Sequence, residues 1–511
     1  MKRLVIVSNR VPAAGTPQAG GLVVALVGLL RRHKGLWFGW SDALADHPDP
    51  EPRVVDRQGI SCAMIDLTPD EHRKYYLGFA NGVLWPLMHI LPGVVSFHRN
   101  ELETYRAVNV RFATALKGLL KKDDLIWVQD YQLLAVPAAL RDQKVGNPIG
   151  FFLHIPFPPP VVAAISEGLL GLVRDVLAAD LIGFQTATDA EHFAQTAALY
   201  AGARRVGKLG LSLGDRTVRL GVFPVEIDAQ EFARVTKAAM ERRPAQDLAH
   251  NLRDRALVLG VDRLDPSKGL VERLTAFRQF LAAEPKWHRR VSFLQIAAKS
   301  REGVQAYRSL LRDLERIAGA TNGAYAEPDW TPLKLVTQSS TRNTVASYMR
   351  HARVGLVTPL RDGMNLVAKE FVAAQDPDDP GVLVLSRFAG AATQLDAALQ
   401  VNPYDPDQIE EAMRRALTMP LAERQERWRD LWDVIKDTSA LAWGEAFADA
   451  LANRKMARTK TERDGTGGLP TKKAVPRASA RGTASKRARP AGSGMAEDGR
   501  PTMGGARTTT G

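Results

Sequence analysis

The chain has 511 residues, 45% hydrophobic and 24% charged, an ordinary globular composition with enough length for two folded units and extra sequence. Its single cysteine, Cys62, excludes an intrachain disulfide and a zinc site of several cysteines, and it favours a reducing, cytoplasmic location. The first residues lack the apolar core of a signal peptide, and the longest apolar stretch, residues 20–30, is too short to cross a bilayer. We therefore expect no export signal and no membrane partner.

The net charge of +13 is concentrated toward the carboxyl end of the chain. Residues 454–511 hold 14 Lys or Arg against 4 Asp or Glu, a balance of +10 that leaves +3 for residues 1–453. This segment has no aromatic residue and no helical or strand periodicity, so we predict a disordered basic tail. A nucleic-acid-binding arm is the alternative, and the missing aromatic stacking residues argue against a nucleic-acid partner.

Before the tail, short apolar runs alternate with longer amphipathic stretches, which is the pattern of strand–helix–strand units around parallel sheets. The predicted strands are residues 4–8, 125–129, 149–154, 181–184, 218–223, 257–261, 291–296, 354–358 and 382–385. The clearest predicted helices are residues 21–32, 270–281, 304–317 and 367–374. We therefore expect a doubly wound α/β fold in two halves, with the break near residues 224–243.

Polar side chains follow many of these strands directly, at the point where each strand ends. They are Asn9, Arg10, Asp130, Tyr131, His154, Asp262, Arg263, Lys299, Ser300, Arg301, Arg361 and Asp362. Ligands of doubly wound α/β folds bind at the carboxyl edge of the strands. Two such sheets facing each other would therefore line one crevice from both sides.

Glycines occupy the loop between the first predicted strand and the first predicted helix. Gly20 and Gly21 would let backbone N–H groups approach a ligand phosphate closely, although the loop is not the GxGxxG of a dinucleotide site. The alternative is a plain turn, since strand-to-helix connections need glycine in any case.

The segment VDRLDPSKGL, residues 261–270, places two cations at the start of a helix. Arg263 and Lys268 could hold a diphosphate there, because the partial positive charge of a helix start also favours anions. A solvated loop with an Arg–Asp pair is the alternative.

Two carboxylates flank a glycine turn in the segment from residue 354 to residue 370. Asp362 and Glu370 are eight residues apart, so one could accept hydrogen bonds from a sugar and the other from a nucleotide ribose. Alternatively, Glu370 is an exposed first-turn acid that balances the helix dipole.

Longer motifs occur in collinear order: LVIVSNR, GGLVVAL, GLWFGW, NGVLWPLMH, QDYQLL, GFFLHIPFP, VDRLDPSKG, TPLRDGMNLVAKEFVAAQ and VLVLSRFAGAA. Together they resemble the trehalose-6-phosphate synthases from about residue 4 to about residue 451. The resemblance implies a GT-B architecture of two Rossmann-like domains facing a cleft. We expect an acceptor domain, residues 1–225, and a nucleotide-sugar domain, residues 226–453, whose last helix crosses back.

The same resemblance implies a retaining glucosyltransferase that moves glucose from UDP-glucose or another nucleotide glucose to glucose 6-phosphate, in trehalose biosynthesis and with a role in osmotic stress. The residues expected to act in catalysis are His154, Arg263, Lys268 and Asp362. The implied glucose 6-phosphate site consists of Arg10, Tyr76, Trp85, Asp130 and Arg301. The implied nucleotide-sugar site consists of Gly20, Gly21, Arg263, Lys268, Asp362, Asn365, Leu366, Val367, Ala368, Lys369 and Glu370.

The chain departs from the usual family pattern at four places. It has QDYQL for HDYHL at residues 129–133, Pro266 for a tyrosine, and Glu226 for the glycine of the domain connection PIGI. A bulkier residue near the nucleotide is replaced by Ser340. The donor base therefore stays open between UDP, ADP and GDP.

In the family, the incoming hydroxyl is thought to attack from the face of the leaving group, with a phosphate oxygen accepting its proton. Arg263 and Lys268 can take the place of a divalent ion on the diphosphate, so we expect no metal and no cofactor. The partners expected are the two small-molecule substrates, and a homo-oligomer stays open. The rival interpretations are a transferase for another phosphorylated acceptor, such as glycerol 3-phosphate, and a non-catalytic regulatory protein that has kept the fold.

Overall fold

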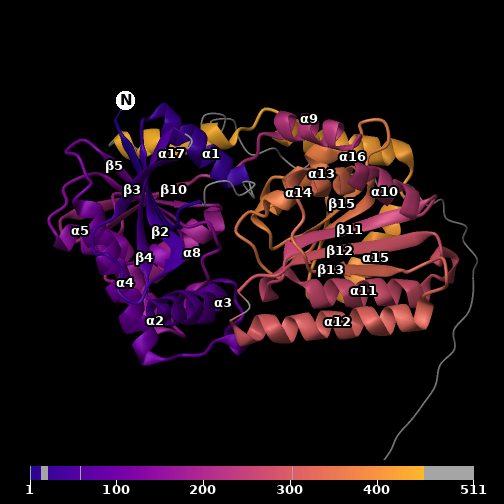
Figure 1. The fold of residues 1–511 in the computed structure, drawn as a ribbon, viewed down its shortest axis with the longest axis horizontal. Coiled ribbons are helices and arrows are strands. Elements are labelled where there is room, and N and C mark those ends of the chain that lie inside the picture. The colour runs from indigo at the N-terminus through magenta and orange to yellow at the C-terminus, as the bar shows by residue number, and fades with distance from the viewer. Residues whose placement is uncertain (1, 13–20, 58, 302, 454–511) are drawn as a thin grey trace, which may run out of the picture. The chain divides into compact units, whose positions relative to one another are not determined.

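The structure, a computed structural model, describes residues 2–12, 21–57, 59–301 and 303–453 (Figure 1). All of them belong to one compact unit, residues 1–457. Gly20 and the predicted tail, residues 454–511, lie outside the described residues.

The first sheet begins with the run LVIVSNR, whose alternating side chains are buried on opposite faces. Val5 and Val7 pack into one core, and Leu4 and Ile6 pack into another, so both faces of the sheet are covered. The ten strands found among the described residues run in the order β3 (Arg53–Arg57), β4 (Ile60–Leu67), β2 (Leu36–Leu44), β1 (Leu4–Arg10), β5 (Leu125–Gln129), β6 (Ile149–Phe152), β7 (Leu181–Phe184), β10 (Arg216–Val222), β9 (Gly210–Leu213) and β8 (Arg204–Arg205). The strands from β4 to β10 in this order pair in parallel, while β3, β9 and β8 pair antiparallel at the edges.

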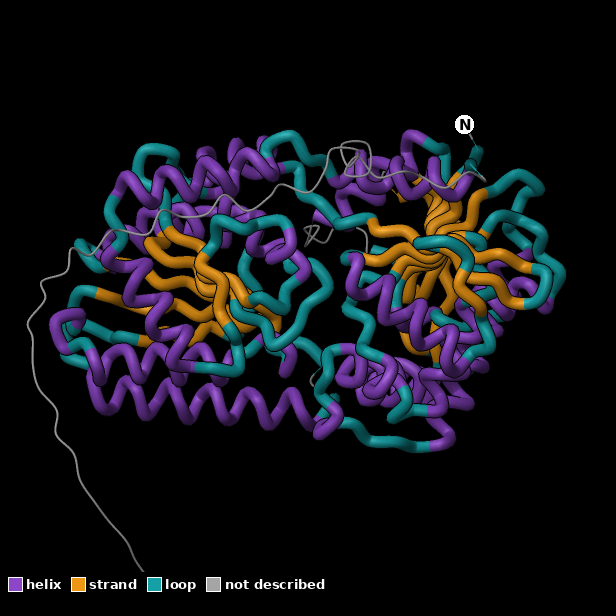
Figure 2. The backbone as a smooth tube through the Cα atoms, turned by 180° about the vertical axis from the view of Figure 1, so that it is seen from behind, coloured by secondary structure: helices purple, strands orange, loops and turns teal. Residues whose placement is uncertain are grey.

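Helices cover both faces of this sheet and connect its strands (Figure 2). They are α1 (Gly21–Arg32), α2 (Pro69–Glu71), α3 (Trp85–Met88), α4 (Arg99–Lys117), α5 (Val136–Asp142), α6 (Pro160–Ala163), α7 (Glu167–Val176) and α8 (Ala187–Tyr200). Between α2 and α3 the chain forms a π-helix, His72–Leu84. We call this sheet, its helices and α17 (Ala440–Ala452) the N-terminal lobe.

The second sheet is parallel throughout, and its strands read as continuous apolar runs because helices bury both faces. Its order is β13 (Leu333–Val336), β12 (Val291–Ala298), β11 (Ala256–Arg263), β14 (Ala352–Val357), β15 (Val382–Ser386) and β16 (Leu399–Val401). Its helices are α9 (Ala229–Ala239), α10 (Arg243–Leu252), α11 (Leu270–Ala283), α12 (Gln305–Tyr325), α13 (Arg342–His351), α14 (Leu366–Ala374), α15 (Pro406–Thr418) and α16 (Leu421–Ile435). These elements form the C-terminal lobe.

The chain crosses between the lobes twice, after β10 and again after α16. The second crossing lets α17 pack beside α1 and against β5 and β7 of the N-terminal lobe (Figure 1). The ring of Phe447 in α17 stacks on Trp127 at 4.3 Å, and side chains at Gly150 and Gly183 would collide with it. The two crossings lie side by side, because Thr438 Oγ1 donates a hydrogen bond to the carbonyl of Ile227 at 3.0 Å.

The predicted strands and helices are present, and several bounds differ. Strand β6 ends at Phe152, so His154 lies in the following loop and not in the strand, and α12 continues to Tyr325 beyond the predicted helix. The π-helix and seven of the described strands were not predicted: β2, β3, β4, β8, β9, β13 and β16. The two sheets confirm the predicted α/β class, while the division at residues 225 and 226 stays a prediction.

Candidate active site

The carboxyl ends of the parallel strands carry the polar side chains that the sequence places there. Arg10 ends β1, Asp130 follows β5, and His154 lies two residues beyond β6. In the C-terminal lobe, Arg263 ends β11 and Asp362 follows β14. The edges of both sheets therefore contribute charged groups, as ligand-binding edges of such sheets do.

A cavity of about 890 Å³ lies between these edges. It is lined by Ser8, Asn9, Arg10, Pro12, Val23, Leu26, Trp37, Tyr76, Gln129, Asp130, Gln132, His154, Ser339, Ser340, Thr341 and Arg342. The cavity thus brings Arg10, Tyr76, Asp130 and His154 together with the start of α13 from the other lobe. Two further groups lie outside its lining and form a second cluster. They are Trp85 with Arg301, and residues 261–270, which we call the diphosphate segment after the anion that the sequence predicts there.

Arg10 presents a partly free guanidinium to the cavity. Its side chain is 44% exposed, and its Nη2 atom lies 3.0 Å from Asp42 Oδ1. The guanidinium carbon lies 4.8 Å from the ring centroid of Trp40 and 6.0 Å from that of Tyr76, which itself stacks on His72. The aromatic rings therefore hold a cation whose hydrogen-bonding edge can still receive an anion.

Asp130 and His154 are held against each other at the floor of the crevice. The backbone N–H of His154 donates to Asp130 Oδ1 at 3.1 Å, and His154 Nε2 lies 2.8 Å from Gln129 Oε1. Burial raises the pKa of Asp130 to about 6, although backbone hydrogen bonds from His154 and Tyr131 oppose the shift. Burial also lowers the pKa of His154 to about 3, so this imidazole is neutral at neutral pH and acts through hydrogen bonds.

The second cluster surrounds Arg301, which follows β12. Its guanidinium lies over the ring of Trp85 at 3.9 Å, and only 7% of its side chain is exposed. Nη1 pairs with Asp265 Oδ2 at 3.1 Å and also contacts the Tyr307 hydroxyl, while Nη2 donates to the Tyr131 hydroxyl at 3.0 Å. The guanidinium of Arg301 is therefore already hydrogen-bonded to groups of both lobes.

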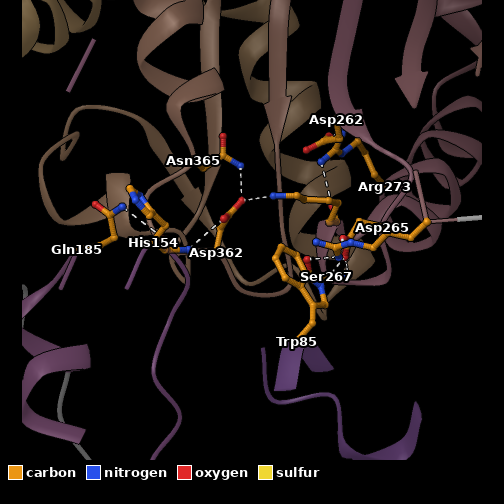
Figure 3. A network of polar contacts seen from close by, with 12 residues as sticks. Trp85, His154, Gln185, Asp262, Asp265, Ser267, Arg273, Asp362 and Asn365 are labelled. Carbon is orange, nitrogen blue, oxygen red and sulfur yellow. Dashed lines mark hydrogen bonds and ion pairs between the residues drawn. The ribbon is translucent and has the colours of Figure 1, made fainter. Parts of the chain in front are cut away.

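Asp362, in the loop after β14, lies beside Asn365 (Figure 3) and pairs with the diphosphate segment. Lys268 Nζ pairs with Asp362 Oδ2, which also accepts from Asn365 Nδ2 at 3.0 Å. Burial would raise the pKa of Asp362, but Lys268 outweighs it and holds that pKa below the ordinary value. The Arg263 side chain is exposed, and its guanidinium lies 5.6 Å from the ring centroid of Trp85.

The stretch from Asn365 to Glu370 opens α14, and its members face different surroundings. The first-turn N–H groups at Leu366, Val367 and Ala368 form a positive helix start. Burial raises the pKa of Glu370 to about 7, opposed by Arg342. The Lys369 ammonium is fully buried and points to the lobe connection, where it reaches the Val225 carbonyl at 3.1 Å and Glu226 Oε2 at 2.6 Å.

Four of the nine non-glycine residues with positive φ in the described part of the chain lie at or beside this site. Asp42, Asp130, Arg301 and Asn365 all have positive φ, at 78°, 72°, 50° and 69°. Such a conformation costs a non-glycine residue about 1–3 kcal/mol and persists only where the surroundings determine it. Gly363 meets a related constraint, because a Cβ there would lie 2.0 Å from the His154 carbonyl oxygen.

Several residues of the site were not predicted from the sequence. Asp265 stands inside the motif VDRLDPSKG, and Asn81, which accepts a hydrogen bond from the Tyr131 hydroxyl at 2.7 Å, stands inside NGVLWPLMH. Tyr307 lies on the buried face of α12 and has the pattern of a core residue, so no sequence signal marked it. Gly21 begins α1, as expected.

Within the described ranges, no three His, Cys, Asp or Glu residues gather in a way that could hold a metal ion. A search of the same ranges finds no helix with the length and apolarity that a membrane span requires.

Known proteins resemble this chain over most of its length. A curated trehalose-6-phosphate synthase of Sinorhizobium fredii (strain NBRC 101917 / NGR234) is 44% identical over 456 residues, covering 88% of this chain and 98% of that protein. A crystal structure of an alpha,alpha-trehalose-phosphate synthase (UDP-forming) from Burkholderia vietnamiensis matches with a TM-score of 0.87 and 43% identity, covering 89% of this chain and 97% of the other. The UDP-forming synthase from Burkholderia xenovorans in complex with glucose-6-phosphate matches with a TM-score of 0.85 and 42% identity, covering 88% and 100%.

These likenesses confirm the expected fold class, GT-B, in which two Rossmann-like lobes face a cleft. The model of glycosyltransferase family 20 matches residues 3–453, which include both sheets and α17. The chain therefore belongs to glycosyltransferase family 20.

Proposed function

We propose that this chain transfers glucose from UDP-glucose to glucose 6-phosphate with retention at the anomeric carbon, giving trehalose 6-phosphate and UDP. The observation that carries the proposal is the meeting of cationic and sugar-binding groups from two sheet edges across one crevice. The names of the relatives, which are UDP-forming synthases including one in complex with glucose-6-phosphate, support the choice of both substrates.

The acceptor is assigned to the N-terminal side of the crevice. Arg10 binds the phosphate, because its guanidinium is held by aromatic rings with an open edge toward the cavity. Tyr76 and Asp130 line the same cavity, where a carboxylate can accept from sugar hydroxyls. Trp85 and Arg301 complete the acceptor site from the second cluster.

The donor is assigned to the C-terminal side. Arg263 and Lys268 neutralise the diphosphate, and the helix starts at Gly21 and at Asn365, Leu366, Val367 and Ala368 supply N–H groups. Asp362 accepts from the transferred sugar, and Glu370 accepts from the ribose. The Lys369 ammonium pairs with Glu226, so we assign Lys369 a supporting role: it holds α14 against the lobe connection.

Transfer proceeds by attack of the anomeric hydroxyl oxygen of glucose 6-phosphate on the donor anomeric carbon, from the face that the diphosphate leaves. The new C–O bond forms as the bond to the diphosphate breaks, and the hydroxyl proton passes to the departing phosphate oxygen. Arg263 and Lys268 stabilise the charge that develops there. Neutral His154 and Asp362 orient the glucosyl unit.

This mechanism leaves the carboxylates without a nucleophilic role. A retaining glycosidase uses two carboxyl groups about 5–5.5 Å apart, one of them free to attack. Asp362 is engaged by Lys268, Asn365 and the Gly363 N–H, and Asp130 accepts from the His154 N–H. Held in this way, both carboxylates orient the sugars. We also infer a cytoplasmic setting, supported by the single cysteine Cys62.

The test is a product assay with the purified chain. Glucose 6-phosphate is offered with UDP-, ADP- and GDP-glucose, and UDP-glucose is offered with glycerol 3-phosphate and with free glucose. We expect trehalose 6-phosphate and UDP from the first pair, with the donor α-configuration retained in the NMR spectrum. Turnover confined to glycerol 3-phosphate, or none with any pair in a folded protein, would refute the proposal.

A further inference from the structure

Asp265 contacts three parts of the site, which are Trp85, the rest of the diphosphate segment and Arg301. None of the roles assigned above uses it. It precedes the short 3-10 helix Pro266–Lys268, and its carboxylate is fully buried. Figure 3 shows it in one group with Trp85 of the N-terminal lobe and Ser267 of the diphosphate segment, both of which donate hydrogen bonds to it.

The two carboxylate oxygens of Asp265 have separate sets of donors. Oδ1 accepts from the Ser267 N–H at 3.0 Å, from Ser267 Oγ at 2.8 Å and from Trp85 Nε1 at 3.1 Å. Oδ2 accepts from Arg301 Nη1 at 3.1 Å and from the Tyr307 hydroxyl at 2.9 Å. Oδ1 is thus bound to the diphosphate segment and to Trp85 of the N-terminal lobe. Oδ2 is bound to Arg301, the arginine assigned to the acceptor site.

The carboxylate is held in its charged form. Burial alone would raise the pKa of Asp265, but Arg301, Arg263 and Lys268 outweigh it and keep that pKa far below the ordinary value. A buried anion with five donors is a rigid element, because losing any donor leaves part of its charge unpaired.

We propose that Asp265 is a positioning residue that fixes Arg301 relative to the diphosphate segment and thereby couples acceptor binding to donor binding. The inference rests on the proposed function. A diphosphate on Lys268 further restrains the segment of residues 265–268, and Asp265 transmits that restraint to Arg301. Glucose 6-phosphate then meets a preformed phosphate site and loses less free energy to ordering.

Substitution Asp265→Asn separates this role from simple packing. The amide oxygen can still accept from Trp85 and Ser267, whereas the amide NH₂ would face the donors of Arg301 and Tyr307. Asp262→Asn is the matched control: Asp262 is also a carboxylate of this segment, pairs with Arg273 Nη1 at 2.7 Å, and has an almost fully buried side chain. No hydrogen bond or ion pair described for Asp262 joins it to Trp85 or Arg301.

The experiment measures the Kd of glucose 6-phosphate by calorimetry, with and without saturating UDP, on the full chain and on each variant. In the parent, we expect UDP to lower this Kd by about fivefold to 150-fold, the usual range of coupling between sites. In Asp265→Asn the two Kd values should become equal within about twofold, while Asp262→Asn keeps the parent ratio. Thermal unfolding checks that each variant is folded.

An unchanged ratio in Asp265→Asn, no coupling in the parent, or an equal loss in Asp262→Asn would overturn the inference. If Asp265→Asn does not fold, Trp85→Phe decides, because it keeps an aromatic ring under Arg301 and removes the Nε1 donor with the rest of the indole. A parent-like ratio there would overturn the inference as well. A parent that forms no trehalose 6-phosphate refutes the proposed function itself. A parent that forms it with coupling untouched by these variants refutes only the role of Asp265.

Discussion

The buried ammonium of Lys369 in α14 lies 2.6 Å from Glu226, a residue of the first crossing between the lobes. Glu226 also accepts from Gln394 Nε2 at 3.0 Å. Burial lowers the pKa of Lys369 and Glu226 opposes that shift, so the pair joins the helix of the proposed donor site to the lobe connection.

Glu226→Gln should therefore lower the free energy of unfolding by about 3–5 kcal/mol, because it removes the negative charge that pairs with this buried cation and leaves it with neutral acceptors. The double variant with Lys369→Met should recover much of that loss. Asp433→Asn is the control, since its pair with Lys436 is exposed and its loss should change the free energy of unfolding far less. Denaturant titration measures all four proteins, and a cost for Glu226→Gln no greater than the control would contradict the prediction.

The pKa of Glu370 predicts a pH dependence of donor binding. Because burial raises this pKa to about 7, protonation removes the proposed ribose acceptor below that pH. The KM for UDP-glucose should rise as pH falls through about 7, and Glu370→Gln should flatten this profile. The KM for glucose 6-phosphate in parallel titrations is the control for general acid effects.

Glu370 also makes the free energy of unfolding depend on pH. Its pKa is raised on folding from 4.5 to about 7, so the folded state binds more protons between these values. The contribution is fully present below pH 4.5 and is lost as pH rises through about 7. Glu370→Gln should lose this slope of stability against pH, and a slope equal to that of the parent would contradict the assignment.

Arg10→Ala should weaken glucose 6-phosphate by about 1.5–3 kcal/mol, the value of a charge-assisted hydrogen bond, with little effect on UDP-glucose. Free glucose should be a poor acceptor for the parent for the same reason. Asp42→Asn is the matched control, because it removes the ion-pair partner of Arg10 and leaves the guanidinium in place. Equal weakening of both substrates together with lower stability would mean that Arg10 only supports its loop.

Activity should survive chelation, because Arg263 and Lys268 are proposed to balance the diphosphate charge. Turnover with EDTA should match turnover with added magnesium within about twofold. Lys268→Met should instead lower turnover strongly, by about 2 kcal/mol or more for a lost charged partner of the diphosphate. Activity that disappears with EDTA and returns with a divalent ion would contradict this account.

Much of the fold and part of the site follow from local pattern. The polar residues after β1, β5, β11 and β14 could be placed because parallel strands share one edge. Strand β2 was missed because its run LWFGWSDAL loses the apolar pattern after Trp40 and ends in the exposed residues Asp42, Ala43 and Leu44, and β13 was missed because it is short and half-buried at an edge.

The hydrogen-bond and ion-pair partners of the site residues could not be predicted. They depend on the directions in which side chains point in the packed structure, which local sequence pattern does not give. Lys369 and Glu370 are neighbours, yet successive helical side chains diverge by about 100°, so one meets the lobe connection and the other meets Arg342. Tyr131 and Tyr307 are buried aromatic residues by pattern, and only the packed lobes show their hydroxyls on Arg301.

Helix α17 determines the order in which the chain can fold during synthesis. Trp127, in the middle of the first sheet, receives its stacking partner from Phe447, so the whole C-terminal lobe is synthesised before that core can close. Domains of many proteins fold as soon as they leave the ribosome, amino end first. Here the apolar surface around Trp127 lacks its cover until α17 has been synthesised, so the N-terminal lobe cannot complete this core before the rest of the chain is made.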